Sequence, residues 1–124
     1  MNILISNSSS MPIYEQIKKQ IIDQIIDGSL NENDMLPSIR SLSKDIKISV
    51  MTIKKAYDEL EAEGYIISRQ GKGSYVAPKN MDLILEQVKQ EIEEHIESAI
   101  DIATKHGISK EELKDIFEFM ISTE

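Results

Sequence analysis

The chain has 124 residues, of which 40% are hydrophobic and 29% charged, a balance typical of a folded protein rather than a disordered one. It contains no cysteine, which excludes disulfide scaffolds, thiolate zinc sites and cysteine nucleophiles. The net charge is −8, and no apolar run is long enough to cross a bilayer, so we expect a cytoplasmic protein without a membrane partner.

The negative charge is concentrated in the last third of the chain. Residues 1–78 carry a net charge of −1, whereas residues 79–124 carry −7. Within residues 38–57, five basic residues accompany a single acid, which gives a local charge of +4. A partner senses this local charge, because charges beyond about 8–10 Å are screened at physiological salt. The sequence therefore predicts a domain over 1–78 with a basic region, and an acidic tail over 79–124.

The N-terminal part begins with a helix. Residues 1–11 are typical of a mobile lead-in, in which Ile3 and Ile5 could form a short edge strand. Apolar side chains then recur at helical spacing, which predicts a helix over about 12–27. Residues 29–37 are polar and read as a turn.

Two further helices follow, separated by a short turn. Ser38 is a favourable N-cap for a helix over about 39–46, and Ser49 is a favourable N-cap for a longer helix that ends near Gly64. Two helices joined in this way are the outline of a helix-turn-helix.

A small β-hairpin is predicted next. Residues 65–68 and 74–76 are rich in β-forming residues and flank a glycine-rich, basic tip over 69–73. Three helices followed by a basic hairpin is the order of a winged helix-turn-helix, so the predicted fold is mainly α with a small β-hairpin.

The tail is predicted to form two amphipathic helices. The first, over about 80–106, would extend about 40 Å at 1.5 Å per residue, too long to be covered by the preceding domain. We therefore expect its apolar stripe to contact a second copy of the chain, which makes the protein a homodimer. The predicted dimerisation residues are Leu85, Val88, Ile92, Ile96, Ala99 and Ala103 on the first helix, and Leu113, Ile116, Phe117 and Met120 on the second.

The basic region offers side chains suited to double-stranded DNA. A helical wheel with Ile53 and Tyr57 on the buried face exposes the opposite side of the same helix. Thr and Lys side chains can bind bases or phosphates, and apolar side chains can contact thymine methyl groups. The candidate DNA-binding residues are Ser49, Val50, Met51, Thr52, Lys54 and Lys55 on this helix, Arg40 on the preceding one, and Arg69, Gly71 and Lys72 at the hairpin tip. Asp58 fits less well near phosphates, and we expect it to lie beyond the groove floor or to restrain a lysine.

Four segments resemble the DNA-binding domain of the GntR family. They are Leu36-Pro37-Ser38-Ile39-Arg40-Ser41-Leu42, the helix from Ile48 to Tyr65 with its Leu60-Glu61-Ala62-Glu63-Gly64 ending, the tip from Arg69 to Val76, and the entry Pro12-Ile13-Tyr14-Glu15-Gln16-Ile17. The short helical tail is similar to that of the YtrA subfamily. The resemblance implies a bacterial repressor, often of transporter operons, that binds palindromic operators as a dimer.

The resemblance also implies contact positions. Those of the family fall on Ser38, Arg40, Ser49, Val50, Met51, Thr52 and Gly71. Position 50 is often Arg in the family, and position 51 is usually smaller or polar, so the operator sequence stays open.

Other functions are weighed against this one. A winged helix can bind proteins, so an adaptor with an acidic interaction arm is the alternative. Arg40 could simply pair with Asp34 or Asp45. Glu91 and His95 are spaced for a metal, but no further ligands accompany them, so we expect no metal site. The sequence supplies no nucleophile, base or cofactor loop either, so we expect no cofactor and no enzymatic activity. Whether a small-molecule effector exists is left open.

Overall fold

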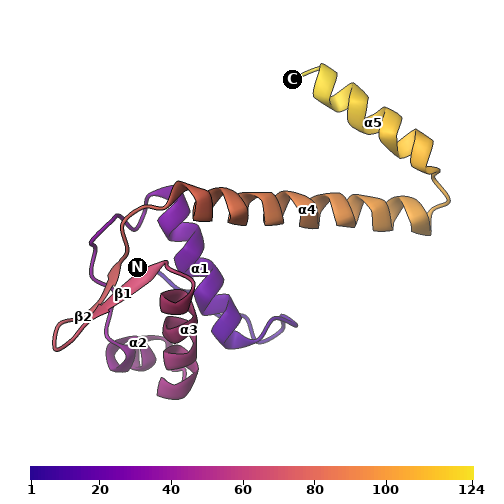
Figure 1. The fold of residues 1–124 in the computed structure, drawn as a ribbon. Helices are drawn as coiled ribbons and strands as arrows, with labels where there is room; N and C mark the ends of the chain where they lie inside the picture. Colours follow the sequence, from indigo (N-terminus) through magenta and orange to yellow (C-terminus); the bar gives the residue numbers. More distant parts are fainter. The chain divides into compact units, whose positions relative to one another are not determined.

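The computed structural model describes residues 1–124 (Figure 1). These residues form two compact units, Met1–Lys79 and Asn80–Glu124. This division falls one residue from the predicted boundary. The first unit contains α1 (Ile13–Asp27), α2 (Ile39–Ile46), α3 (Val50–Ala62), β1 (Ile66–Arg69) and β2 (Gly73–Val76), and the second contains α4 (Met81–Lys105) and α5 (Lys110–Ser122). The predicted fold class, mainly α with a small β-hairpin, is confirmed.

The core of the first unit lies where α1 packs against α3. Ile17 and Ile21 of α1 and Ile53 and Leu60 of α3 are completely buried. Removing such side chains from water is the main source of stability in a small domain. The apolar stripes that predicted these helices are therefore the faces that meet.

A charged contact also joins α1 to α3. The Lys18 ammonium lies 3.2 Å from Glu59 Oε1 and also pairs with Glu63. Burial alone would lower the pKa of Lys18, but the hydrogen bonds to Glu63 and Glu59 outweigh it and raise the pKa. The lysine therefore holds the C-terminal half of α3 against α1 as a charged group.

Serine caps fix the starts of α2 and α3, as predicted. The Ser41 amide donates to Ser38 Oγ at 3.0 Å, and the Thr52 amide donates to Ser49 Oγ at 3.2 Å. Each cap satisfies an amide that has no partner within its own helix.

The turn between α2 and α3 is also held in place. Lys47 adopts a left-handed conformation with φ of 58°, which ends α2. The Ser43 hydroxyl donates to the carbonyl oxygen of Ile48 at 2.5 Å and closes the turn.

The hairpin pairs in antiparallel register, from Ile66 opposite Val76 to Arg69 opposite Gly73. Residues 33–36 add a third segment at the β2 edge. The Leu36 amide donates to the Ser74 carbonyl at 2.9 Å, and the Val76 amide donates to the Asp34 carbonyl at 2.8 Å. The prediction that 29–37 is only a turn was therefore incomplete, because its second half pairs with the hairpin.

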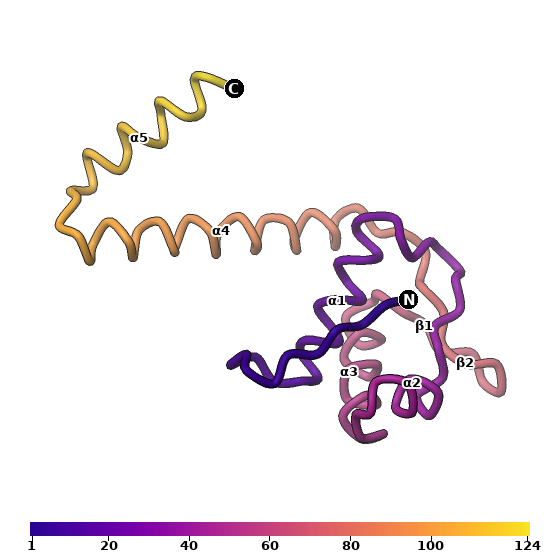
Figure 2. Tube along the Cα trace, turned by 180° about the vertical axis from the view of Figure 1, so that it is seen from behind, coloured from indigo at the N-terminus to yellow at the C-terminus, as the bar shows by residue number.

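The lead-in is held against α1 rather than paired as a strand, so the suggested edge strand is wrong. Gln16 hydrogen bonds to both the amide and the carbonyl of Ser6, at 2.9 Å each, and Gln20 does the same to Leu4, at 2.8 and 2.6 Å. Ile3 beside them is buried, with 7% of its surface exposed. Figure 2 shows this segment running along α1.

The second unit is a pair of helices. Gly107, with φ of 72°, allows the chain to turn after α4, and Ser109 caps α5 by accepting from the Glu112 amide at 3.1 Å. Ala103 is the buried side chain of this unit, with 5% of its surface exposed. Neither these helices nor those of the first unit combine the length and hydropathy needed to cross a membrane.

Candidate DNA interface

The first two turns of α3 form an exposed ridge. Val50 is 40% exposed and Met51 is 73% exposed, and the buried Ile53 and Tyr57 lie on the side of the helix away from Met51. The helical wheel therefore placed Met51 correctly, away from the core. Ser49 is exposed and Thr52 is half-buried.

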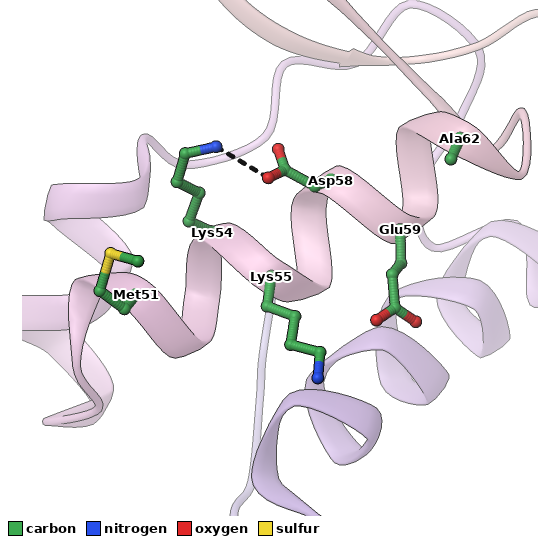
Figure 3. Close-up of a pocket in the computed structure, with 6 residues that line it drawn as sticks. All are labelled: Met51, Lys54, Lys55, Asp58, Glu59 and Ala62. Carbon is green, nitrogen blue, oxygen red and sulfur yellow. Dashed lines mark hydrogen bonds and ion pairs between the residues drawn. The ribbon is translucent and has the colours of Figure 1, made fainter.

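The two lysines of this ridge have partners within the chain, and Figure 3 shows that of Lys54. Lys54 Nζ lies 2.7 Å from Asp58 Oδ2, one helical turn away, as expected for an acid that restrains a lysine. Lys55 Nζ lies 4.0 Å from the centre of the Tyr14 ring on α1. Both lysines are exposed, so they stay accessible to phosphate.

The charge along α3 changes sign between its two halves. The first half carries Lys54 and Lys55, while the second half and its cap carry Asp58, Glu59, Glu61 and Glu63. A shallow hollow of about 330 Å³ spans the change, from Met51 to Ala62. Only the N-terminal half of α3 is therefore suited to a polyanion.

Arg40 lies at the start of α2 with its side chain exposed. It has no carboxylate within ion-pair distance, so the alternative of pairing with Asp34 or Asp45 is not realised. Ser38, which precedes it, is also exposed. An unpaired guanidinium at a helix start is a favourable phosphate ligand.

A buried hydrogen bond fixes the segment that leads into α2. The Tyr57 hydroxyl, on the buried face of α3, donates to the Pro37 carbonyl at 2.7 Å. Burial raises the pKa of Tyr57, so the hydroxyl keeps its proton. Sequence analysis assigned Tyr57 only to the core and missed this positioning role.

The hairpin tip presents basic side chains at its surface. The Arg69 guanidinium stacks 4.5 Å from the centre of the Tyr75 ring, and the Tyr75 hydroxyl donates to the Lys72 carbonyl at 3.2 Å. Gly71 at the turn has φ of 74°, a conformation that favours glycine. Sequence analysis selected Arg69, Gly71 and Lys72 but missed Tyr75, whose diagonal position across the strands was the available signal.

The predicted dimerisation residues of the tail are mostly exposed. In α4, Leu85, Ile92, Ile96 and Ala99 are exposed, Val88 is half-buried and Ala103 is buried; in α5, Ile116, Phe117 and Met120 are exposed and Leu113 is half-buried. An apolar hollow of about 450 Å³ lies between the two helices. Further exposed apolar side chains, absent from the prediction, are Ile100, Ile102, Ile108, Phe119 and Ile121.

Known proteins share this arrangement. Residues 13–76 match the model of the gntR family of bacterial regulatory proteins. The chain belongs to the GntR family. Along most of its length, including the tail, it is similar to the HTH-type transcriptional repressor YtrA of Bacillus subtilis (strain 168): 35% identity over 91% of the chain and 87% of YtrA.

Two solved structures have a similar fold. A transcriptional regulator from Oenococcus oeni superposes with a TM-score of 0.74 at 27% identity, over 94% of this chain and 97% of that one. AraR(DBD) in complex with operator ORX1 superposes with a TM-score of 0.55 at 30% identity, over 62% of this chain and 96% of that one. This GntR chain is thus a DNA-binding transcriptional regulator, and not an enzyme.

Proposed function

We propose that this YtrA-like repressor binds a palindromic operator as a homodimer and blocks transcription by occupying that site. The N-terminal half of α3 would enter the major groove, with Ser49, Val50, Met51 and Thr52 nearest the base edges. The observation that carries the proposal is the exposed ridge that begins α3, which no part of its own unit covers.

The surrounding cations would bind the phosphate backbone. Arg40 would contact phosphate at the start of α2, and Lys54 and Lys55 would do so beside the groove. Arg69 and Lys72 would approach the backbone or minor groove from the hairpin tip, where Gly71 allows a close approach. Each contact is weak alone and sensitive to salt, so two chains acting on two half-sites would supply the affinity.

The tail would supply the dimer. Together, α4 and α5 expose more apolar side chains than is usual for helices on the surface of a monomer. A second copy of the chain can cover them. The acidic faces would stay outside, where they also repel nonspecific DNA. We place the homodimer in the cytoplasm, where bacterial DNA is accessible.

Selection from a random pool of DNA duplexes tests this proposal. We expect the full chain to enrich one inverted repeat, with half-sites separated by about one helical turn or a multiple of it. Failure to enrich any sequence, or enrichment of a single unrepeated site, would contradict the proposal.

The alternative, a protein-binding adaptor, predicts a different result on heparin. A DNA-binding regulator with an exposed basic ridge should be retained and should elute at moderate salt, despite a net charge of −8. An adaptor whose acidic tail dominates its binding would flow through.

A further inference from the structure

The hydroxyl groups at the start of α3 are already engaged with each other. Ser49 Oγ and Thr52 Oγ1 lie 2.8 Å apart, and Ser49 Oγ also accepts from the Thr52 amide at 3.2 Å. A base that bound either hydroxyl would compete with this hydroxyl–hydroxyl contact, and for Ser49 it would also compete with the bond that caps the helix. These two residues are therefore poor candidates for sequence discrimination.

The lysines of the ridge are drawn away from the helix start. Lys54 is paired with Asp58 at 2.7 Å, and Lys55 lies over the Tyr14 ring of α1 at 4.0 Å. Figure 3 shows Lys54 reaching toward Asp58 and Lys55 extending toward α1, while Met51 stands apart from both. Neither lysine is placed to form a bidentate contact with guanine near residue 51.

The remaining side chains at the helix start are apolar. Val50 and Met51 occupy its first two positions, and Met51 is 73% exposed without a contact that would explain an apolar residue there. On base edges in the major groove, the thymine 5-methyl group is the one projecting apolar group, and the groups that distinguish the other bases are hydrogen-bond donors and acceptors. A flexible thioether can pack against such a methyl group.

We propose that Met51, with Val50 beside it, reads the 5-methyl group of a thymine in each operator half-site. This inference rests on the proposed operator binding and specifies how that site discriminates among bases. It assigns a specificity-determining role to apolar contact, and it predicts a T·A pair where Met51 meets the groove.

Deoxyuridine substitution tests the proposal. The duplex enriched by selection is resynthesised with deoxyuridine in place of thymidine at each symmetric pair of positions in turn, which removes the methyl group and keeps base pairing. We expect one such change to weaken binding by the full chain about fourfold per half-site, the effect of one buried methyl-sized group. Affinity is measured by fluorescence anisotropy at fixed salt.

Two variants identify the reader. Met51→Ala should bind the thymine duplex more weakly than the wild type does. The variant should bind the thymine and uracil duplexes with equal affinity, because the methyl group has lost its partner. Met81→Ala is the matched control, since Met81 is also largely exposed but lies at the start of α4. This control should keep the full uracil penalty.

The outcomes separate this inference from the proposed function. Tight binding that no uracil change weakens, or a uracil penalty that persists in Met51→Ala, would overturn the methyl contact and leave operator binding intact. Failure of the wild-type chain to enrich or bind any duplex would overturn both.

Discussion

Arg40 and Lys72 are the cations of the interface whose side chains have no partner within the chain. Lys54, Lys55 and Arg69 each have one: a carboxylate, the Tyr14 ring and the Tyr75 ring respectively. An unpaired, exposed guanidinium loses no internal contact when it binds a phosphate. This difference among side chains of equal charge leads to a prediction about affinity.

Arg40→Ala should weaken binding to the operator and to random DNA to a similar degree. A lost phosphate contact lowers the dependence of log affinity on log salt by about one unit per bound chain. Lys44→Ala removes the same charge from the last turn of α2 and is the matched control. An Arg40→Ala affinity and salt slope equal to those of the control would show that Arg40 does not contact phosphate.

Tyr57→Phe should destabilise the first unit. The variant keeps the buried ring but removes the hydrogen bond to the Pro37 carbonyl, at a cost of about 1–3 kcal/mol in the free energy of unfolding. Tyr14→Phe is the control: its hydroxyl bonds to Glu15 at the surface, so its loss should change that free energy by less than about 0.5 kcal/mol. Urea unfolding measures both, and equal effects would contradict the positioning role of Tyr57.

Alkaline pH offers a second readout for Tyr57. Because burial raises its pKa above the unfolded value, the unfolded state ionises first, and the associated stability is lost as pH rises above about 10. Tyr57→Phe should lose less stability than the wild type between pH 9 and 11, as roughly expected for one fewer titrating group. An unchanged pH profile would mean that Tyr57 does not contribute to it.

At the scale of the elements, one aromatic ring of the hairpin contacts both of its basic residues. Tyr75 lies diagonally across the two strands from Arg69, and its ring stacks on the Arg69 guanidinium. The same tyrosine donates a hydrogen bond to the Lys72 carbonyl at the tip. Tyr75 therefore restrains both basic residues of the hairpin.

Tyr75→Leu should weaken DNA binding about two- to fivefold, the value of an exposed cation–π contact, because Arg69 becomes mobile. Tyr75→Phe keeps the ring and should retain most of the affinity. In an Arg69→Ala background, Tyr75→Leu should have little further effect on affinity. A Leu variant that binds as well as the Phe variant would show that the stack does not position Arg69.

The elements also show what the sequence alone could predict. Helix caps at Ser38 and Ser49 are local signals, so the starts of α2 and α3 were predicted within a residue. That Asp58 restrains a lysine was one of two expectations from the sequence, and Lys54, four residues away, is that lysine.

Contacts between distant segments carry no such signal. The pairing of residues 33–36 with β2 joins a short polar segment without alternation to a strand about forty residues later. Gln16 and Gln20 resemble ordinary surface residues of a helix, although they bind the backbone of the lead-in. The position of Lys55 over Tyr14 likewise depends on how α1 meets α3.

At the scale of the whole molecule, the proposed binding to a palindromic operator requires two chains. Phe117→Asp places a charge on the apolar stripe of α5 and should convert the proposed homodimer to a monomer, with operator affinity lowered about a hundredfold or more through lost bivalency. Phe119→Asp is the control, because Phe119 lies about 160° from Phe117 around the helix. Light scattering after size exclusion gives the mass of each, and a wild-type monomer or identical effects would contradict the predicted interface.

The central claim, that the start of α3 enters the major groove in two copies, has a direct test. Because the chain has no cysteine, Lys47→Cys introduces a unique thiol for an iron–EDTA cleavage reagent, in the exposed turn before α3 and outside the proposed contact residues. On the selected duplex we predict two symmetric clusters of strand cleavage, one within each half-site. In each cluster, the cleaved positions on the two strands should be offset as expected for a reagent in the major groove. A single cluster, scattered cleavage, or cleavage confined to the flanks of the selected site would contradict the account.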